Sequence, residues 1–320
     1  MRLCIVAEGQ EGIAWDRWLA LAQRCEALGF EALFRSDHYR STVGGEERDC
    51  LDAWATLAAL AAATERIRLG TLVSPATFRH PSELAKVVTT VDHVSQGRVE
   101  LGLGAGWFEG EHRAFGFPFA ETPERMAAFA EQIEIIHRQW SAERFDFDGQ
   151  HYTLTGCEPL PLPVQRPHPP IVVGGSGGRG TVDAAVRFAD EYNAPYLSPA
   201  DCAACRDKLL AGCERGERDP ASLPFSLMTG FVIGTDDADV RRRGEGVMRW
   251  ENGGDDIAAF LDSHREDWII GTVQQAAERI ALYAEAGVER LYLQHLDYEN
   301  DDTLELIAHE LAPQVTIARR

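Results

Sequence analysis

Short β-like runs alternate with longer amphipathic helical runs along almost the whole chain, and this alternation limits the possible folds more than any other feature. Such an order is typical of parallel strands joined by crossover helices. Eight such units predict a closed (β/α)8 barrel, an α/β TIM barrel whose functional residues gather at the carboxyl ends of the strands. The predicted strands are Leu3–Ala7, Ala32–Arg35, Ile67–Leu72, Val99–Leu103, Ile171–Gly174, Glu191–Ala194, Phe225–Ile233 and Leu291–Gln294.

A doubly wound open sheet would show the same alternation. Its dinucleotide-binding fingerprint would follow the first strand, but the glycines at positions 9 and 12 have the wrong spacing for it. Two stretches exceed a minimal barrel: residues 145–170, with a hairpin-turn signal at Asp148-Gly149, and residues 249–267, rich in Gly, Asp and Trp. We expect both to be insertions within one domain that spans residues 1–320.

Charge and cysteine content limit the partners and the compartment. The formal net charge of −20 repels phosphate backbones and acidic membrane faces, so we expect neither nucleic acid nor membrane as a partner. No apolar stretch is long enough to span a bilayer, and the first residues lack a signal-peptide pattern. Seven scattered cysteines fit a reducing cytoplasm, and no cysteine or histidine spacing predicts a metal site. These features predict a cytoplasmic protein with a small-molecule ligand.

Several strand exits carry side chains that suit a ligand site. Ser36-Asp37-His38 follows the second strand, Gly104-Ala105-Gly106-Trp107 the fourth, and His295 the eighth. The exit of the fifth strand, Gly174–Thr181, has five glycines in its first seven positions. In a parallel barrel these exits converge on one mouth.

The Gly174–Thr181 loop lies between a strand and the start of a helix. Its backbone N–H groups could hold an anion at the positive end of that helix, with Arg179 adding charge, which predicts a phosphate site. A flexible turn into a glycine-rich helix is the alternative interpretation. The phosphate hypothesis involves Gly174, Gly175, Ser176, Gly177, Gly178 and Arg179.

Three side chains are candidates for chemistry. His38, beside Asp37, could donate a proton near neutral pH, or it could merely cap a strand. Glu109 and Glu111 follow the fourth strand and could act as acid or base, although exposed loop glutamates are common. Trp107 could form a wall for a flat ring or plug the top of the barrel.

The strand exits, taken in this order, resemble the bacterial luciferase-like superfamily, and particularly its branch that uses the deazaflavin coenzyme F420. The resemblance spans nearly the whole chain. The motifs that carry it are Ser36–His38, Arg66–Pro81, Gly97–Gly116, Phe145–Leu154 and Pro169–Gly175. It implies a luciferase-like barrel with insertions, with the cofactor ring against a non-proline cis peptide. Matching Thr77-Phe78-Arg79 places this bond at Leu72–Val73.

By this resemblance, one set of residues contacts the cofactor. The run Leu101–Gly106 is closer to F420 users than to FMN users, so we expect F420, with FMN as the alternative. The implied reaction is hydride transfer between F420 and a small organic substrate, with His38 handling the proton and Glu109 as a second catalytic candidate. The implied cofactor contacts are Asp37, His38, Leu72, Val73, Thr77, Gly104, Ala105, Gly106, Trp107, Gly174, Gly175, Ser176, Gly177, Gly178 and Arg179.

The sequence also departs from the sugar-phosphate dehydrogenases of this superfamily. Trp107 stands where they carry an acid, and the loops 195–201 and 297–302 contain no cation, so a neutral or apolar substrate fits better than a sugar phosphate. The alternatives are an FMN-dependent monooxygenase that uses reduced flavin and oxygen, and a flavin- or deazaflavin-binding protein without turnover. Barrels of this superfamily commonly dimerise, and the Ala-rich run Trp54–Ala63 predicts a homodimer.

Overall fold

The computed structural model describes residues 1–43, 47–141, 143–298, 300 and 302–315. Within them, eight parallel strands close into a barrel, so the predicted (β/α)8 fold is confirmed. Each strand pairs with the next in chain order, and the last returns to the first. The barrel strands are β1 (Arg2–Ala7), β2 (Ala32–Arg35), β3 (Arg68–Thr71), β5 (Val99–Gly104), β8 (Ile171–Gly174), β9 (Glu191–Pro195), β10 (Phe225–Gly234) and β12 (Val288–His295).

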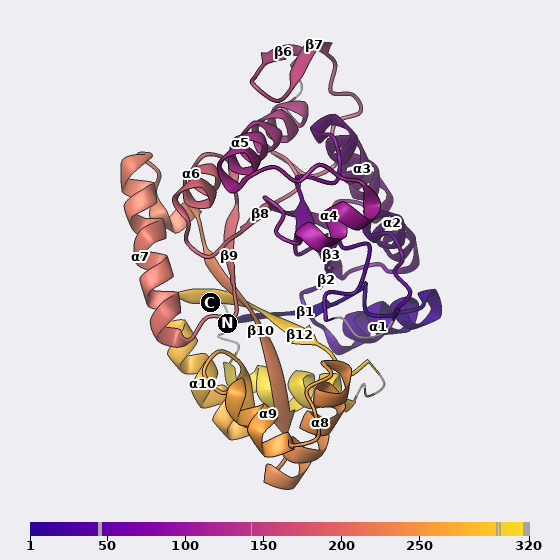
Figure 1. The fold of residues 1–320 in the computed structure, drawn as a ribbon, viewed down its shortest axis with the longest axis vertical. Helices are drawn as coiled ribbons and strands as arrows, with labels where there is room; N and C mark the ends of the chain where they lie inside the picture. The colour runs from indigo at the N-terminus through magenta and orange to yellow at the C-terminus, as the bar shows by residue number, and fades with distance from the viewer. Residues whose placement is uncertain (44–46, 142, 299, 301, 316–320) are drawn as a thin grey trace.

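The helices form a ring around these strands (Figure 1). The 14-residue helix α1 ends at Gly29, whose φ of 79° is the left-handed conformation that glycine adopts readily. Thr272 and Gln275 form a capping box at the start of α10. The helices are α1 (Trp15–Leu28), α2 (Ala53–Ala63), α3 (Pro81–Ser95), α4 (Glu109–Phe115), α5 (Thr122–Gln139), α6 (Arg179–Phe188), α7 (Pro199–Arg215), α8 (Asp237–Trp250), α9 (Ile257–Ser263), α10 (Val273–Glu285), α11 (Asp302–Leu306) and α12 (Ala312–Val315), with a 3₁₀ turn at Pro220–Ser222 and a π-helical turn at Ile307–Leu311.

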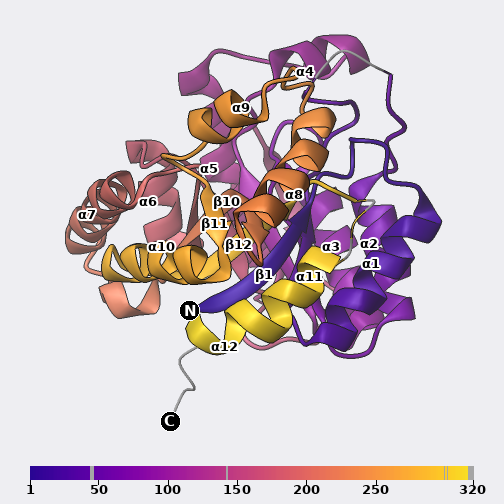
Figure 2. The same ribbon diagram turned by 90° about the horizontal axis from the view of Figure 1, so that it is seen from below.

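The two predicted insertions lie in different places. Residues 145–170 leave the barrel as a two-stranded hairpin, β6 (Phe145–Asp148) and β7 (Thr153–Cys157), which lies beyond α5 in Figure 1. Residues 249–267 contain the end of α8 and all of α9. Figure 2 shows α4 and α9 at one end of the barrel, and the N-terminus and α12 at the other.

Two short strands are absent from the sequence-based prediction. β4 (Ser74–Pro75) adds two residues beside β5. β11 (Ile269–Thr272) pairs with the last four residues of β10, past the point where β10 pairs with β12. Such short apolar runs cannot be assigned from periodicity, so only the tertiary pairing identifies them as strands.

An ion-pair network fills the inside of the barrel below the mouth. Arg290 on β12 is 2% exposed and donates to Glu100 on β5 at 2.8 Å and to Glu191 on β9 at 3.2 Å. Burial raises the pKa of Glu100, but Arg290 and Arg68 outweigh this effect and lower it to about 2. The barrel interior is therefore packed, and any ligand must bind above this layer.

No helix in the described ranges combines the length and the apolar character that crossing a membrane requires.

Candidate active site

A cavity of about 540 Å³ opens where the barrel strands end. Its volume lies in the range typical of small-molecule and cofactor sites, roughly 300–1,000 Å³. Loops far apart in the sequence meet here, as the strand-exit argument predicts. The sequence-predicted residues that line the cavity are His38, Leu72, Val73, Gly104, Ala105, Gly106, Trp107, Gly174, Gly175 and Ser176.

Val73 forms part of the wall that closes the cavity toward β5 and β8. The peptide bond between Leu72 and Val73 is a non-proline cis bond, as the resemblance implied. A Cβ on Gly104 would lie 2.8 Å from Val73 Cγ2, and one on Gly174 would lie 2.9 Å from Val73 Cγ1. Carbon atoms normally stay about 3.5–4.0 Å apart. These two positions therefore need glycine so that Val73 fits between the strands and faces the cavity.

The glycine turn after β8 separates this cavity from the outer surface. Ser176 lines the cavity, whereas the next residue, Gly177, faces an outer hollow. The N–H of Gly177 donates to the Tyr192 hydroxyl at 2.8 Å, and its φ is 77°. Gly178 is the N-cap of α6. The turn thus presents the N-terminal end of a helix to the cavity side, which favours an anionic group there.

His38 lies in the cavity wall and is held by a buried carboxylate. Its Nδ1 is 2.8 Å from Oε2 of Glu111, and Glu111 also accepts the backbone N–H groups of Tyr39 and Arg40. Burial alone lowers the pKa of His38, but the hydrogen bond and charge of Glu111 outweigh this effect, so the pKa is raised. Glu111 is fully buried. Glu111 therefore holds Nδ1 and favours the protonated imidazole, and Nε2 makes no hydrogen bond to any of the described residues.

Glu109, the predicted second catalytic residue, is not brought to the cavity. It is exposed in the first turn of α4, whereas Glu111 is buried against His38. Positions two apart on a helix point in nearly opposite directions, so only one of the two glutamates can face the barrel mouth. The sequence offered both, and the packing of α4 selects Glu111.

Asp37 is buried beside His38 but lies outside the cavity lining. It accepts from Arg79 Nη1 at 2.6 Å and from the Ser74 hydroxyl at 2.6 Å. Burial lowers the pKa of Arg79, but the charge of Asp37 outweighs this effect and raises it. Asp37 therefore ties the exit of β2 to the exit of β3, and it does not contact a ligand in this arrangement.

Four further predicted cofactor contacts also lie outside the cavity lining. Thr77 Oγ1 is 2.6 Å from His112 Nε2, so Thr77 supports the loop behind Gly106. Gly177 and Arg179 line the outer hollow, and the Arg179 side chain is 83% exposed. Gly178 lies between the two spaces as the helix cap.

A polar chain that the sequence analysis missed runs along another wall. The Tyr196 hydroxyl donates to Gln294 Oε1 at 2.8 Å, and Gln294 Nε2 donates to Glu8 Oε1 at 2.6 Å. Gln10 Nε2 donates to the other oxygen of Glu8 at 2.9 Å. Glu8 follows β1 and Gln294 lies near the end of β12, so the strand-exit argument could have identified both.

His295 was expected at the mouth but is buried on the opposite face of β12, where it lines a small cavity with Arg243 and Val247 of α8. Its ring stacks near Phe231, with centroids 6.4 Å apart, and meets Tyr298 edge to face at 5.7 Å. Neighbouring residues on a strand point to opposite faces, and Gln294 takes the cavity side.

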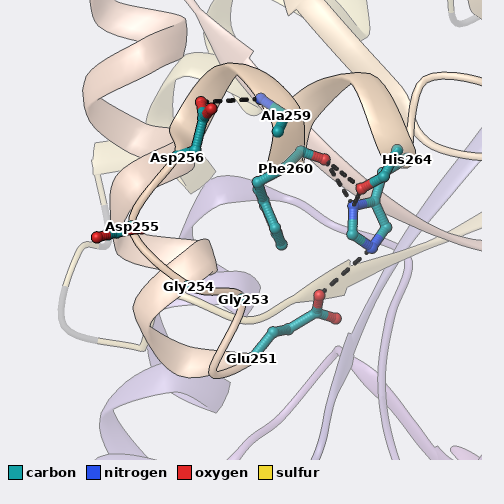
Figure 3. Close-up of a pocket in the computed structure, with 9 residues that line it drawn as sticks. Glu251, Gly253, Gly254, Asp255, Asp256, Ala259, Phe260 and His264 are labelled. Atoms are coloured by element: carbon teal, nitrogen blue, oxygen red, sulfur yellow. Dashed lines mark hydrogen bonds and ion pairs between the residues drawn. The ribbon is translucent and has the colours of Figure 1, made fainter.

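The second insertion covers the mouth from the side of α8. Trp250 and Glu251 line the cavity, and Glu251 also lines a neighbouring pocket of about 390 Å³ between α8 and α9. Figure 3 shows His264 Nε2 reaching Glu251, at 3.4 Å, and Asp256 capping α9. The pKa of Glu251 is raised, chiefly by burial. The insertion therefore supplies side chains to the cavity and is fixed by its own polar contacts.

A closed parallel barrel with a cavity at its carboxyl-end mouth and a histidine–glutamate pair in the cavity wall belongs to the class of TIM-barrel enzymes. Residues 4–290 match the family model described as luciferase-like monooxygenase, so the chain belongs to this family.

Relatives with two kinds of cofactor are similar to this chain. It is 26% identical to an FMNH(2)-dependent dimethylsulfone monooxygenase of Pseudomonas putida, over 93% of this chain and 88% of that protein. It is 30% identical to an F420-dependent glucose-6-phosphate dehydrogenase of Beutenbergia cavernae, over 94% of each. An F420-dependent secondary alcohol dehydrogenase, solved with an F420-acetone adduct, superposes with a TM-score of 0.83 at 18% identity, over 99% of each chain. The family therefore includes F420-dependent oxidoreductases and FMN-dependent monooxygenases.

Proposed function

We propose that this protein is an F420-dependent oxidoreductase that transfers a hydride between the deazaflavin and a small neutral organic substrate. The observation that carries the proposal is the His38–Glu111 pair in the wall of a ring-sized cavity, because hydride transfer to or from a carbonyl-like carbon needs a proton partner beside it.

The residues that would hold the cofactor fit a flat ring with a charged tail. Val73, packed against the α-carbons of Gly104 and Gly174, offers an apolar face for the ring. The turn at Ser176 and the start of α6 suit a phosphate. When bound, the deazaflavin supplies two-electron hydride chemistry, and the protein supplies position and protons.

His38 has the role of proton carrier in this proposal. Glu111 holds Nδ1 and favours the protonated ring, so Nε2–H points a donor at a substrate oxygen or nitrogen. Trp107, 66% exposed at the rim, meets the His38 ring edge to face with centroids 5.8 Å apart. This contact limits the approach of water from that side.

The charges of the cavity support a substrate without phosphate. Two carboxylates, Glu8 and Glu251, line it, and no lysine or arginine occurs among its described lining residues. An anionic substrate would meet repulsion from both carboxylates, with only the protonated His38 to offset it. The Glu8–Gln294–Tyr196 chain instead offers hydrogen-bond acceptors and donors to a neutral polar group.

A reduced-FMN monooxygenase is the second candidate function. The similarity to the dimethylsulfone monooxygenase, over nearly the whole of both chains, favours it. The same cavity would then serve the isoalloxazine ring, and oxygen would replace the hydride acceptor.

Titration of the purified protein with F420 and with FMN, followed by cofactor fluorescence, tests the proposal. We expect tight F420 binding, and oxidation of reduced F420 by one class among enones, ketones and imines, or reduction of F420 by alcohols. Tight FMN binding with no F420 affinity would overturn it in favour of the second candidate. If His38→Ala leaves every activity unchanged while Gly175→Asp abolishes cofactor binding, the protein is a carrier without turnover.

A further inference from the structure

A second hollow lies on the outer side of the glycine turn, between α6 and α7. Its volume is about 270 Å³, and it is lined by Gly177, Arg179 and Val182 from the turn and α6, and by Lys208, Ala211 and Arg215 from α7. Three of these six residues are cations. Arg179, predicted to be part of the phosphate site, instead lines this outer hollow.

Lys208 lies directly against the turn. A Cβ placed on Gly177 would be 3.2 Å from Lys208 Cδ and 3.7 Å from its ammonium nitrogen. Lys208 is one of only two lysines in the chain, and no ion pair of it occurs within the described residues. Its ammonium group therefore lies beside the backbone of the turn.

The two arginines share one acidic neighbour. Arg215 Nη2 is 3.0 Å from Asp183, and Arg179 Nε is 3.4 Å from the same carboxylate. The hollow therefore carries three positive charges against one negative charge, on a chain whose net charge is −20. Asp183 holds both guanidinium groups near the rim of the hollow.

Charge is thus separated across the turn. The inner cavity has two carboxylates and neither lysine nor arginine among its described lining residues, whereas the outer hollow has one lysine and two arginines. Ser176 faces the inner side and Gly177 the outer side. A ligand whose phosphate lies at this turn and whose chain continues past it would leave the acidic cavity and enter the basic hollow.

We propose that the hollow lined by Arg179, Lys208 and Arg215 is a subsite for the oligoglutamate tail of F420. The inference rests on the proposed function and extends it. In F420 the phosphate is a diester that continues into a lactyl group and a chain of glutamates, each with a carboxylate, whereas FMN ends at its phosphate. Only the first cofactor can reach the outer cations, so the subsite selects between the two cofactors of the family.

The alternative is that these cations are an ordinary solvated helix surface. In that case their charges would only raise the general attraction of the protein surface for anions, and a lysine elsewhere on the surface would have a similar effect on binding. The subsite differs from this alternative in requiring tail carboxylates and in depending on Lys208 specifically.

The test compares F420 that carries several glutamates with F420 that carries none, by fluorescence titration at low and high salt. The variants are Lys208→Glu, the conservative Lys208→Arg, and Lys86→Glu, which makes the same change of net charge at the other lysine, on α3. Because an exposed charge pair contributes little, reversing one charge should weaken binding of the long-tailed cofactor by up to about fivefold, or about 1 kcal/mol. Lys208 is exposed, and circular dichroism will show that each variant is folded.

We expect Lys208→Glu to weaken binding of the long-tailed form alone, Lys208→Arg to retain it, and Lys86→Glu to have little effect. The difference between the two forms should shrink at 1 M salt, where the screening length falls to about 3 Å. Equal loss for both forms, equal loss in Lys86→Glu, or no loss at all would overturn the subsite. If neither form of F420 binds and FMN does, the proposed function fails together with the subsite, whereas strong binding of both forms with no tail dependence removes the subsite alone.

Discussion

One added methyl group at Gly174 would test whether Val73 forms the wall of the cofactor cavity. In Gly174→Ala the new Cβ would lie 2.9 Å from Val73 Cγ1 and 3.4 Å from Cγ2. Against a normal carbon contact of about 3.5–4.0 Å, the closer pair overlaps by roughly 0.6–1.1 Å. Val73 has little room on its other sides, because a Cβ on Gly102 would lie 3.2 Å from its Cγ1 and one on Gly104 would lie 2.8 Å from its Cγ2. Its side chain must therefore move into the cavity.

The size of the effect follows from overpacking. Extra methylene groups in a packed site cost about 1–3 kcal/mol. Unfolding entropy of about 2.1 cal/mol/K per residue over 320 residues converts this cost into a drop in Tm of roughly 2–5 °C. Because Val73 moves toward the ring position, cofactor affinity should also fall, by about tenfold or more.

Two further variants give the assay its controls. Gly178→Ala adds the same methyl in the same loop, but its nearest neighbour, Thr181 Oγ1, is 3.8 Å away, so it does not displace Val73. Because Gly178 is the N-cap of α6, we expect only a smaller loss of stability from the weaker cap. In the double variant Gly174→Ala/Val73→Ala, the nearest atom of residue 73 to the new Cβ at position 174 is its own Cβ, 3.8 Å away. The double variant should therefore be no less stable than Val73→Ala alone. Thermal scans and fluorescence titrations measure both quantities. A double variant that is still destabilised by the added methyl would refute the reasoning.

Three other outcomes are expected. If His38 is the acid, the rate of substrate reduction should fall as pH rises through the raised pKa of His38. Glu111→Gln removes the charge that raises this pKa, so the fall in rate should begin at a lower pH. A pH–rate profile that does not move would exclude a catalytic role for the His38–Glu111 pair. Arg290→Met removes the buried cation that Glu100 and Glu191 share and should cost about 3–5 kcal/mol in denaturant unfolding. Because the pKa of Glu100 lies at about 2 against its usual 4.5, the wild-type protein should lose stability as pH falls between these values, and Glu100→Gln should reduce that loss. Trp107 is 66% exposed. Trp107→Ala should therefore change the free energy of unfolding by less than about 0.5 kcal/mol but weaken cofactor binding. If the free energy of unfolding falls by as much as the free energy of cofactor binding, Trp107 is a packing residue.

The barrel could be predicted from the sequence because most of its strands are short, largely apolar runs that alternate with helices, some of which have clear stop signals, as at Gly29. Buried parallel strands and amphipathic helices are local patterns that need no knowledge of distant residues. The motif order also placed the cis bond at Leu72–Val73, where the structure has it.

The polar partners inside the site could not be predicted in this way. Glu8 and Gln294 are 286 positions apart, and Glu111 lies 73 positions from His38. No local pattern distinguishes the buried Glu111 from the exposed Glu109, since both are glutamates near the start of the same short helix.

The sequence by itself determined the order of strands, the glycine turn after β8 and the set of strand exits that face the mouth, because these follow from periodicity and backbone chemistry along the chain. Only the tertiary structure decided which side chains face the cavity, that Asp37 binds Arg79 and turns away from a ligand, and that Arg179 joins Lys208 and Arg215 outside the turn. The reason is physical: the direction of a side chain, and the charge that meets it, depend on how helices and strands from distant parts of the chain pack together.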